Sequence, residues 1–517
     1  MSGPVPNPII GGFHPDPTIC RVGDDFYLAN SSFEWFPGVP IHHSRDLVHW
    51  RLIGNALDRP SQLPLAGVHH SGGIWAPTLR WHAGRFYLIT TNIAGGGNLL
   101  VSATDAAGPW SEPIWIDPQG YDPSLFFDTD GTCFLTKAGS DAAGRHGIVQ
   151  YRIDPDTGRH LSPPVLVWTG SGGFGVEGPH LLRRGAWYYL LCAEGATHVG
   201  HMVTIARSSA ADGPYISCPR NPILTHRDHL DRTIQATGHG DLVEIQDGSW
   251  WITCLGIRSH GSMCMAQHLL GRETFLAPVT WEADGWPLVN GGAGVAEQVA
   301  SPLPDHPWPP PAPRDDFDSP HLDPCWVFLR NPMPGSWSLA EQPGHLCLHG
   351  ATPSLETAGT PSLVVRRQEH RDCRFRICLS AQLPEPGDEA GLTIFLNGGH
   401  HQDFGLVRRA SGMVLQLRRR ADDVEHIAAE LPVTTSVIEL EAWCNPWAIG
   451  YFYSDASATI ATATAPVGWT RLAKATTKTL TTEFGGGFTG VMLGVYALGS
   501  ARAAIDWIDY GPCERMP

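Results

Sequence analysis

Five stretches of this chain follow one plan, and this repetition limits the possible folds more than any other feature. Each stretch has a polar or aromatic head, an apolar run, a glycine turn about seven to nine residues after the head, and a second aromatic-rich run. The heads are Asp16, Trp75, Asp122, Glu177 and His239, spaced about 47 to 62 residues apart. Two such runs around a glycine turn are typical of a β-hairpin, and each interval has room for four strands. The repeat therefore predicts a five-bladed β-propeller.

Three of the heads are carboxylates. Equivalent positions of a propeller lie at equivalent radii, so we expect Asp16, Asp122 and Glu177 to meet at one end of the central channel. Cleavage of a glycosidic bond needs one carboxylic acid and one carboxylate acting from the opposite side of the ring, and a third carboxylate nearby raises the proton affinity of the acid. The alternative is that these residues only begin turns, for which Asp is common. Their shared position in the repeat favours acid–base chemistry.

Other residues near the heads are candidates for a sugar pocket. Trp75 is itself a head and should face the channel, and Phe33 follows the first hairpin, where it would form an aromatic wall. Arg258 is a candidate donor to sugar hydroxyls. His239 heads the last repeat, and this axial position makes it a candidate metal ligand as well as a structural histidine.

The rest of the chain predicts a second domain. A Pro-rich segment at 301–314 is expected to be a stiff linker between a propeller at 1–300 and a domain at 315–517. Beyond the linker the repeat is lost, and alternating strand patterns divided by Gly, Pro and Asp predict a jelly-roll-like β-sandwich. These strands are expected at 374–379, 391–396, 413–417, 437–443, 491–496 and 503–510.

Composition narrows the classes of function. A length of 517 residues is too great for one ordinary core and predicts two domains. The 58 glycines and 44 prolines favour an all-β, turn-rich chain. The net charge of −16 argues against nucleic acid as a partner. The 12 cysteines are scattered singly, so we expect buried free thiols. We expect no membrane span and a cytoplasmic location, because no apolar run is long enough and the N-terminus lacks a secretory pattern.

Several motifs resemble family 43 of the glycoside hydrolases, in its two-domain branch of β-xylosidases and α-L-arabinofuranosidases. The likeness extends over nearly the whole chain. The motifs lie at 12–17, 32–38, 41–47, 122–126, 177–180, 271–276, 284–287 and 487–490.

The resemblance implies a role for each candidate residue of the site. It implies an inverting reaction with Asp16 as general base, Glu177 as general acid and Asp122 as the residue that tunes and orients the acid. It further implies Phe33, Trp75 and Arg258 as pocket residues, and Phe488 as an aromatic lent by the sandwich to close the pocket. No cofactor is required for the chemistry. His239 matches a histidine that faces a hydrated cation in relatives, so calcium, structural or activating, is the candidate ion of the channel.

The expected activity is release of xylose from the non-reducing ends of β-1,4-xylooligosaccharides. An α-L-arabinofuranosidase acting on arabinoxylan-derived oligosaccharides, or a bifunctional enzyme, is the close alternative. An invertase-like fructosidase is more distant, because residues 12–18 lack the Asn-Asp-Pro-Asn-Gly type of turn. A carbohydrate-binding protein without catalysis should lack the acid or the base, and both are present. The sequence leaves a homo-oligomer open.

Overall fold

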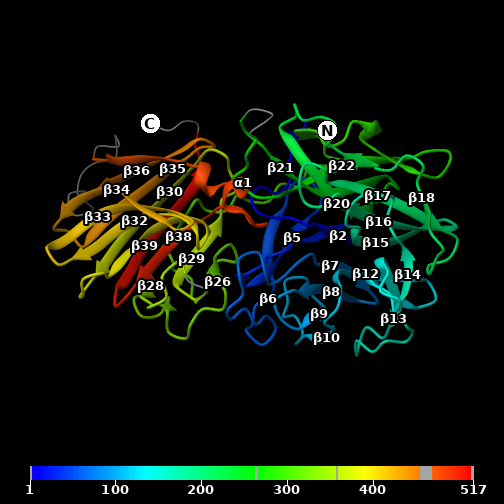
Figure 1. The fold of residues 1–517 in the computed structure, drawn as a ribbon, viewed down its shortest axis with the longest axis horizontal. Helices are drawn as coiled ribbons and strands as arrows, with labels where there is room; N and C mark the ends of the chain where they lie inside the picture. The colour runs from blue at the N-terminus through cyan, green and yellow to red at the C-terminus, as the bar shows by residue number, and fades with distance from the viewer. Residues whose placement is uncertain (1–2, 262–265, 357–358, 455–467, 514–517) are drawn as a thin grey trace. The chain divides into compact units, whose positions relative to one another are not determined.

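The computed structural model describes residues 3–261, 266–356, 359–454 and 468–513, and most of these residues lie in antiparallel strands (Figure 1). The chain divides into two compact units. The first comprises Met1–Leu65, Gly72–Met265 and Arg272–Trp308; the second comprises Ala66–Ser71, Ala266–Gly271 and Pro309–Pro517. The prediction of an all-β chain with two kinds of domain is confirmed.

The described part of the first unit contains five antiparallel sheets of four or five strands in chain order, coloured from blue to green in Figure 1. The first two blades are β2 (Thr18–Val22), β3 (Asp25–Ala29), β5 (Gly38–Ser44) and β6 (Arg51–Leu57), then β7 (Thr78–His82), β8 (Arg85–Asn92), β9 (Gly97–Ala103) and β10 (Ile114–Asp117). The third is β11 (Tyr121–Phe127), β12 (Cys133–Ser140), β13 (His146–Ile153) and β14 (Val165–Trp168).

The fourth and fifth blades complete the set. The fourth is β15 (Glu177–Arg184), β16 (Trp187–Glu194), β17 (Met202–Ser208) and β18 (Ile216–Ser217), with β19 (Leu224–Thr225) also pairing with β17. The fifth is β20 (Ile234–Glu244), β21 (Trp250–Arg258), β22 (Glu273–Trp281) and β23 (Pro287–Val289). A short strand, β4 (Trp35–Phe36), lies between β3 and β5 in the chain, and a 3-10 turn, η2 (Asn290–Gly292), follows β23.

The first strand of every blade is the inner one. Strands β2, β7, β11, β15 and β20 contact one another in a closed cycle, which makes them the wall of a central channel. The ring closes because the segment before β2 joins the last blade. Ile10 forms a bridge with Thr274 of β22, and β1 (Val5–Pro6) pairs with β24 (Gln298–Val299).

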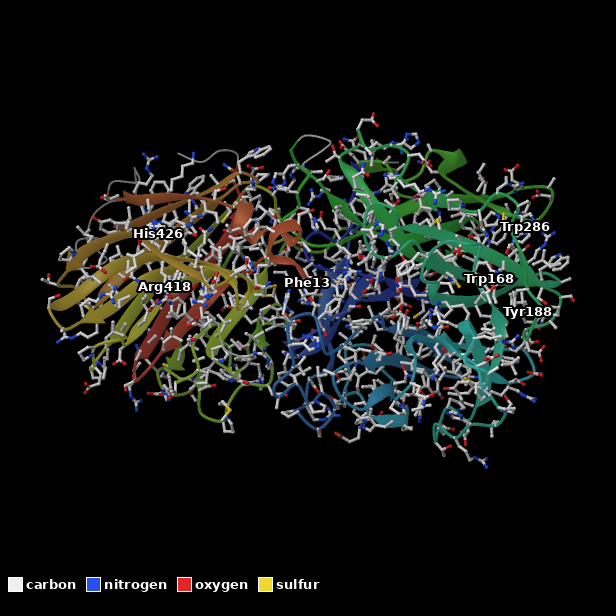
Figure 2. The ribbon with its side chains drawn as sticks, viewed as in Figure 1. Phe13, Trp168, Tyr188, Trp286, Arg418 and His426 are labelled. Atoms are coloured by element: carbon white, nitrogen blue, oxygen red, sulfur yellow. The ribbon has the colours of Figure 1, made fainter. Side chains whose placement is uncertain are left out.

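Neighbouring blades are held together by apolar clusters between their faces. Trp168 and Tyr188, labelled in Figure 2, belong to the cluster between the third and fourth blades, and Trp286 belongs to the next one. Burying such clusters is the main stabilising contribution to folding. The inner strands are thereby fixed relative to one another, and so are their first residues.

The predicted linker is partly built into the propeller. The backbone N–H of His306 donates to Oδ2 of Asp46 (2.6 Å), and the guanidinium of Arg51 lies 3.8 Å from the ring centre of Trp308. The first unit therefore extends to Trp308, beyond the expected end of the propeller at 300.

The second unit contains two large antiparallel sheets, yellow-green to red in Figure 1. One has the order β27 (Trp337–Ser338), β28 (Leu346–His349), β39 (Arg502–Pro512), β30 (Cys373–Gln382), β35 (Val437–Cys444), β36 (Ala448–Ser454) and β37 (Thr470–Thr476), with β25 (Arg314–Asp315) pairing with β39. The other includes β34 (Val424–Val433), β33 (Gly412–Ala421), β32 (His400–Arg409), β31 (Glu389–Asn397), β38 (Met492–Leu498), β29 (Ser362–Arg367) and β26 (Val327–Leu329). A turn η4 (Lys478–Leu480) and a short helix α1 (Thr482–Gly485) precede β38.

Two polar features of this unit lie outside the predictions. Arg418, labelled in Figure 2, forms a buried network with Asp403 (2.8 Å) and Glu389 (2.7 Å). Cys373 of β30 lies opposite Cys444 of β35, and its hydrogen bond with the Cys444 thiol, together with burial, raises the pKa of Cys373 well above its usual value. The cysteines of the described residues are free and most of them are buried, as expected from the sequence, and strand pairing places two that are distant in the chain opposite one another.

Candidate active site

Left-handed backbone conformations mark the heads of the inner strands. The φ angles of Asp16, Asp122 and His239 are 53°, 52° and 43°, and Gly178, which follows Glu177, has 55°. Residues other than glycine rarely adopt this region, and they gather at functional sites when the surrounding fold enforces it. Four of the five heads thus share the same unusual backbone conformation, within an inner strand or just before it, and this conformation sets the direction of the polar side chains there.

The structure brings the three predicted carboxylates together. The backbone N–H of Gly178, directly after Glu177, donates to Oδ2 of Asp122 (3.2 Å). The charges of Asp16 and Glu177 both act on Asp122, and the charge of Asp16 acts on Glu177. Asp16 and Asp122 are buried, and Glu177 is half-buried. This convergence agrees with the geometry expected from the repeat.

Asp16 lies in surroundings that favour its ionised form. Burial acts to raise its pKa, but the charges of Arg272 and His239 and the hydroxyl of Ser31 outweigh this effect, so the pKa is below the usual value. Nη1 of Arg272 donates to Oδ1 at 2.9 Å, and Oγ of Ser31 donates to Oδ2 at 2.6 Å. Both carboxylate oxygens are therefore held in place. Asp16 is suited to act as a base.

Glu177 and Asp122 have the opposite tendency. Burial and the charge of Asp16 raise the pKa of Glu177 to about 7, against the opposing effect of Arg272. Burial and the charges of Glu177 and Asp16 raise the pKa of Asp122 well above its usual value. A carboxyl group with a raised pKa keeps its proton near neutral pH and can act as a general acid. The cluster thus contains a base and an acid of the same chemical type.

The aromatic candidates lie beside this cluster or in its wall. The guanidinium of Arg272 lies 5.7 Å from the ring centre of Phe33, which is buried and also packs against Phe13. Trp75 makes an edge-on contact with Tyr121, the residue before Asp122 (5.8 Å). Phe33 is therefore linked to the base through Arg272, and Trp75 to the strand of Asp122.

The arginine at the carboxylates is Arg272, and Arg258 has another partner. Nε and Nη2 of Arg258 donate to the two carboxylate oxygens of Glu273, at 2.7 and 2.8 Å. Glu273 also accepts the backbone N–H of Gly12 (2.9 Å). Arg258 thus ties β21 to β22, and its role in sugar binding stays a prediction. Arg272 was not among the predicted site residues, although it lies within the motif at 271–276, which was the available sequence signal for it.

Phe488 belongs to the second unit. Its backbone N–H donates to Oγ of Ser71 (2.8 Å), within the segment Ala66–Ser71 of the same unit. Gly487 has no room for a side chain, because a Cβ there would lie 2.1 Å from Nε2 of His70. The position of Phe488 in its loop is thus defined, and its part in closing a pocket stays a prediction.

His239 faces the base. Its Nδ1 lies 3.7 Å from Oδ1 of Asp16, and a Cβ at Gly178 would come within 2.7 Å of its ring. In the described parts of the chain, no three or more His, Cys, Asp or Glu side chains come together in a way that could hold a metal ion. Calcium favours six to eight oxygen ligands, and the imidazole of His239 offers none. The described side chains around His239 therefore do not fit a directly bound calcium ion.

The described residues include no helix with the length and apolar character needed to cross a membrane.

Family models match both units. Residues 5–287 match the model described as "Glycosyl hydrolases family 43", and residues 314–511 match "Beta xylosidase C-terminal Concanavalin A-like domain". The two matches follow the propeller and the sandwich described above.

Individual relatives extend over the full chain. The non-reducing end alpha-L-arabinofuranosidase BoGH43B of Bacteroides ovatus is 42% identical over 98% of this chain and 94% of its own. A xylosidase/arabinosidase of Butyrivibrio fibrisolvens is 37% identical over 98% of each chain. The crystal structure of a xylan beta-1,4-xylosidase from Bacillus halodurans superposes with a TM-score of 0.91 at 35% identity, covering 98% of this chain and 99% of that one.

Proposed function

The chain belongs to family 43 of the glycosyl hydrolases and is a glycosidase, and from this premise we propose that it releases xylose from the non-reducing ends of β-1,4-xylooligosaccharides with inversion at the anomeric carbon. The proposal extends a family membership that covers both units to one sugar and one stereochemical course.

The observation that carries this proposal is the opposite pKa shift of two carboxyl groups in one cluster. Ionised Asp16 would take a proton from a water molecule, whose oxygen attacks the anomeric carbon, while protonated Glu177 donates its proton to the departing oxygen. Asp122 would orient the acid by accepting the backbone N–H of Gly178, the residue after Glu177. Arg272 and Ser31 would hold the base. All these groups belong to the protein, so no step requires a cofactor.

An α-L-arabinofuranosidase acting on arabinoxylan-derived oligosaccharides is the second candidate. The Bacteroides ovatus relative, at 42% identity, bears that name, and the Butyrivibrio fibrisolvens relative is named for both activities. Xylopyranose and arabinofuranose present similar hydroxyl layouts, so one pocket can accept either.

Initial rates on 4-nitrophenyl β-D-xyloside and 4-nitrophenyl α-L-arabinofuranoside decide between the candidates. We expect the larger kcat/KM on the xyloside, and proton NMR of the hydrolysis of 4-nitrophenyl β-D-xyloside should show α-xylose as the first-formed anomer. A larger kcat/KM on the arabinoside would favour the second candidate. Initial β-xylose would contradict inversion and the role of Asp16 as a base acting through water.

The other expectations from the sequence concern the surroundings of the enzyme. A cytoplasmic location and a homo-oligomer stay predictions. Calcium near His239 also stays a prediction from the resemblance, and it has no part in the proposed reaction. Two residues along β20 from His239, Asp241 pairs with Arg80, and this arginine is a different source of positive charge in the channel.

A further inference from the structure

A buried ion pair lies among the inner strands of the propeller. Arg80 of β7 faces Asp241 of β20, with Nη1 2.9 Å from Oδ2 and Nη2 3.3 Å from Oδ1. The side chain of Asp241 is 3% exposed and that of Arg80 is 17% exposed. A fixed positive charge therefore lies inside the wall of inner strands, two residues along β20 from His239.

The same guanidinium connects further inner strands. It donates to Oγ1 of Thr18 on β2 (3.2 Å) and to Nδ1 of His180 on β15 (3.0 Å). Arg80 and its partners thus join β2, β7, β15 and β20. In a propeller with a metal-filled channel, an ion bound from several blades would make such connections.

The carboxylate of Asp241 has no capacity left for a metal. Besides Arg80, Oδ2 accepts the hydroxyl of Thr18 (3.0 Å) and the backbone N–H of Ile19 (3.0 Å), while Oδ1 accepts the N–H of Leu242 (3.0 Å). A carboxylate offers about four lone-pair sites, and these donors fill them. A cation could reach Asp241 only by displacing a guanidinium.

The histidine at the ion pair is also unavailable as a ligand. A guanidinium only donates, so Nδ1 of His180 must be the acceptor and the proton of the neutral ring lies on Nε2. Neither nitrogen then has a lone pair to offer a metal. Burial lowers the pKa of His180 to about 3, so the ring is neutral at ordinary pH.

We propose that Arg80 is the resident cation of the channel: its guanidinium neutralises Asp241, joins four inner strands and makes the propeller independent of a divalent metal. The inference concerns the scaffold and holds for either candidate sugar. Its test uses metal content and thermal stability, so its failure is distinguishable from a failure of the proposed activity.

The first experiment uses the full chain as purified. After dialysis against a chelator and then metal-free buffer, we expect no stoichiometric metal by mass spectrometry and the same melting temperature with and without added calcium. A ligand that binds the folded state raises the melting temperature, so a bound ion would be visible. Stoichiometric calcium in the dialysed protein, or a rise in melting temperature on adding calcium, would overturn the proposal.

The second experiment removes the charge. Arg80→Met leaves the buried Asp241 unpaired, and we expect the melting temperature to fall by about 10 °C. Arg85→Met is the control, because Arg85 is on the same blade and its contact with Asp156 is long (3.6 Å) and exposed. The double variant R80M/D241N should recover only part of the loss, because it removes the unpaired charge but turns an amide NH₂ toward the backbone N–H of Ile19 or Leu242. If Arg80→Met costs no more than Arg85→Met, the guanidinium is not the structural cation. If Arg80→Met does not fold, the metal measurement on the parent chain still decides.

Discussion

Asp16 and Glu177 carry the same functional group and differ in what surrounds it. Two donors and a nearby histidine stabilise the charge of Asp16, whereas burial and the charge of Asp16 itself oppose ionisation of Glu177. The environments push the two pKa values apart, and such a separation defines the acid and the base of a site. At the scale of single residues, function therefore depends on hydrogen-bond donors that the motif around Asp16 does not contain.

The acid role of Glu177 predicts a dependence on pH and on leaving group. Because its pKa is raised to about 7, kcat/KM on an alkyl or 4-nitrophenyl xyloside should fall as pH rises through about 7 and Glu177 loses its proton. The lowered pKa of Asp16 should keep the base ionised until the pH falls below the usual range of aspartate. Glu177→Ala should remove the fall near pH 7 and reduce kcat/KM by about a hundredfold to ten-thousandfold.

The control for this prediction is the 2,4-dinitrophenyl xyloside, whose leaving group departs without protonation. Glu177→Ala should lose far less activity on this substrate than on the 4-nitrophenyl or alkyl xyloside. Equal losses on all of them would remove Glu177 from the acid role.

The loop before β15 shows how one element positions another. Glu194, at the end of β16, is fully buried, and its carboxylate accepts the backbone N–H groups of Ser171 (2.8 Å) and Gly173 (2.7 Å). The hydroxyl of Thr204 supplies a third donor (2.7 Å). A Cβ at Gly173 would lie 2.6 Å from this carboxylate, so a larger residue there would have to displace it. Glu194 thus fixes the chain a few residues before Glu177.

Glu194→Gln should loosen this loop. The amide NH₂ would face a backbone N–H in place of an acceptor, which we expect to cost about 2 kcal/mol of unfolding free energy. We also expect faster proteolytic cleavage within residues 170–175 and a lower kcat. Glu244→Gln, on an exposed carboxylate of β20, is the matched control and should change neither. Unchanged cleavage and kcat in Glu194→Gln would show that the loop holds its form without the carboxylate.

At the scale of the molecule, the repeat predicted the five blades because every blade begins with a head and a hairpin of its own. The strands β32 and β34 were missed for different reasons. Strand β32 is largely buried but begins with four polar residues, His-His-Gln-Asp. Strand β34 is largely exposed and has no apolar face to mark it. Arg272 and Arg80 were missed for another reason. An arginine that pairs inside a channel looks in sequence like one that faces solvent, and only the fold shows that their carboxylate partners lie about 160 to 260 positions away.

The last prediction concerns the part of the sandwich unit in an exo-acting enzyme. An open channel end suits a polymer that passes across it, whereas removal of a terminal sugar needs a closed pocket, and Phe488 is the predicted closing residue. Its loop is anchored by the backbone N–H that donates to Ser71, a bond that any residue at this position can make. Phe488→Ala should therefore keep the melting temperature nearly unchanged and raise KM for xylobiose about tenfold, as expected for a lost aromatic contact with the sugar. Phe484→Ala, an exposed aromatic of α1, is the control and should leave KM unchanged. If the Phe488→Ala protein hydrolyses xylobiose like the parent, the sandwich contributes stability alone, and residues of the propeller, such as those at 33–38, close the pocket.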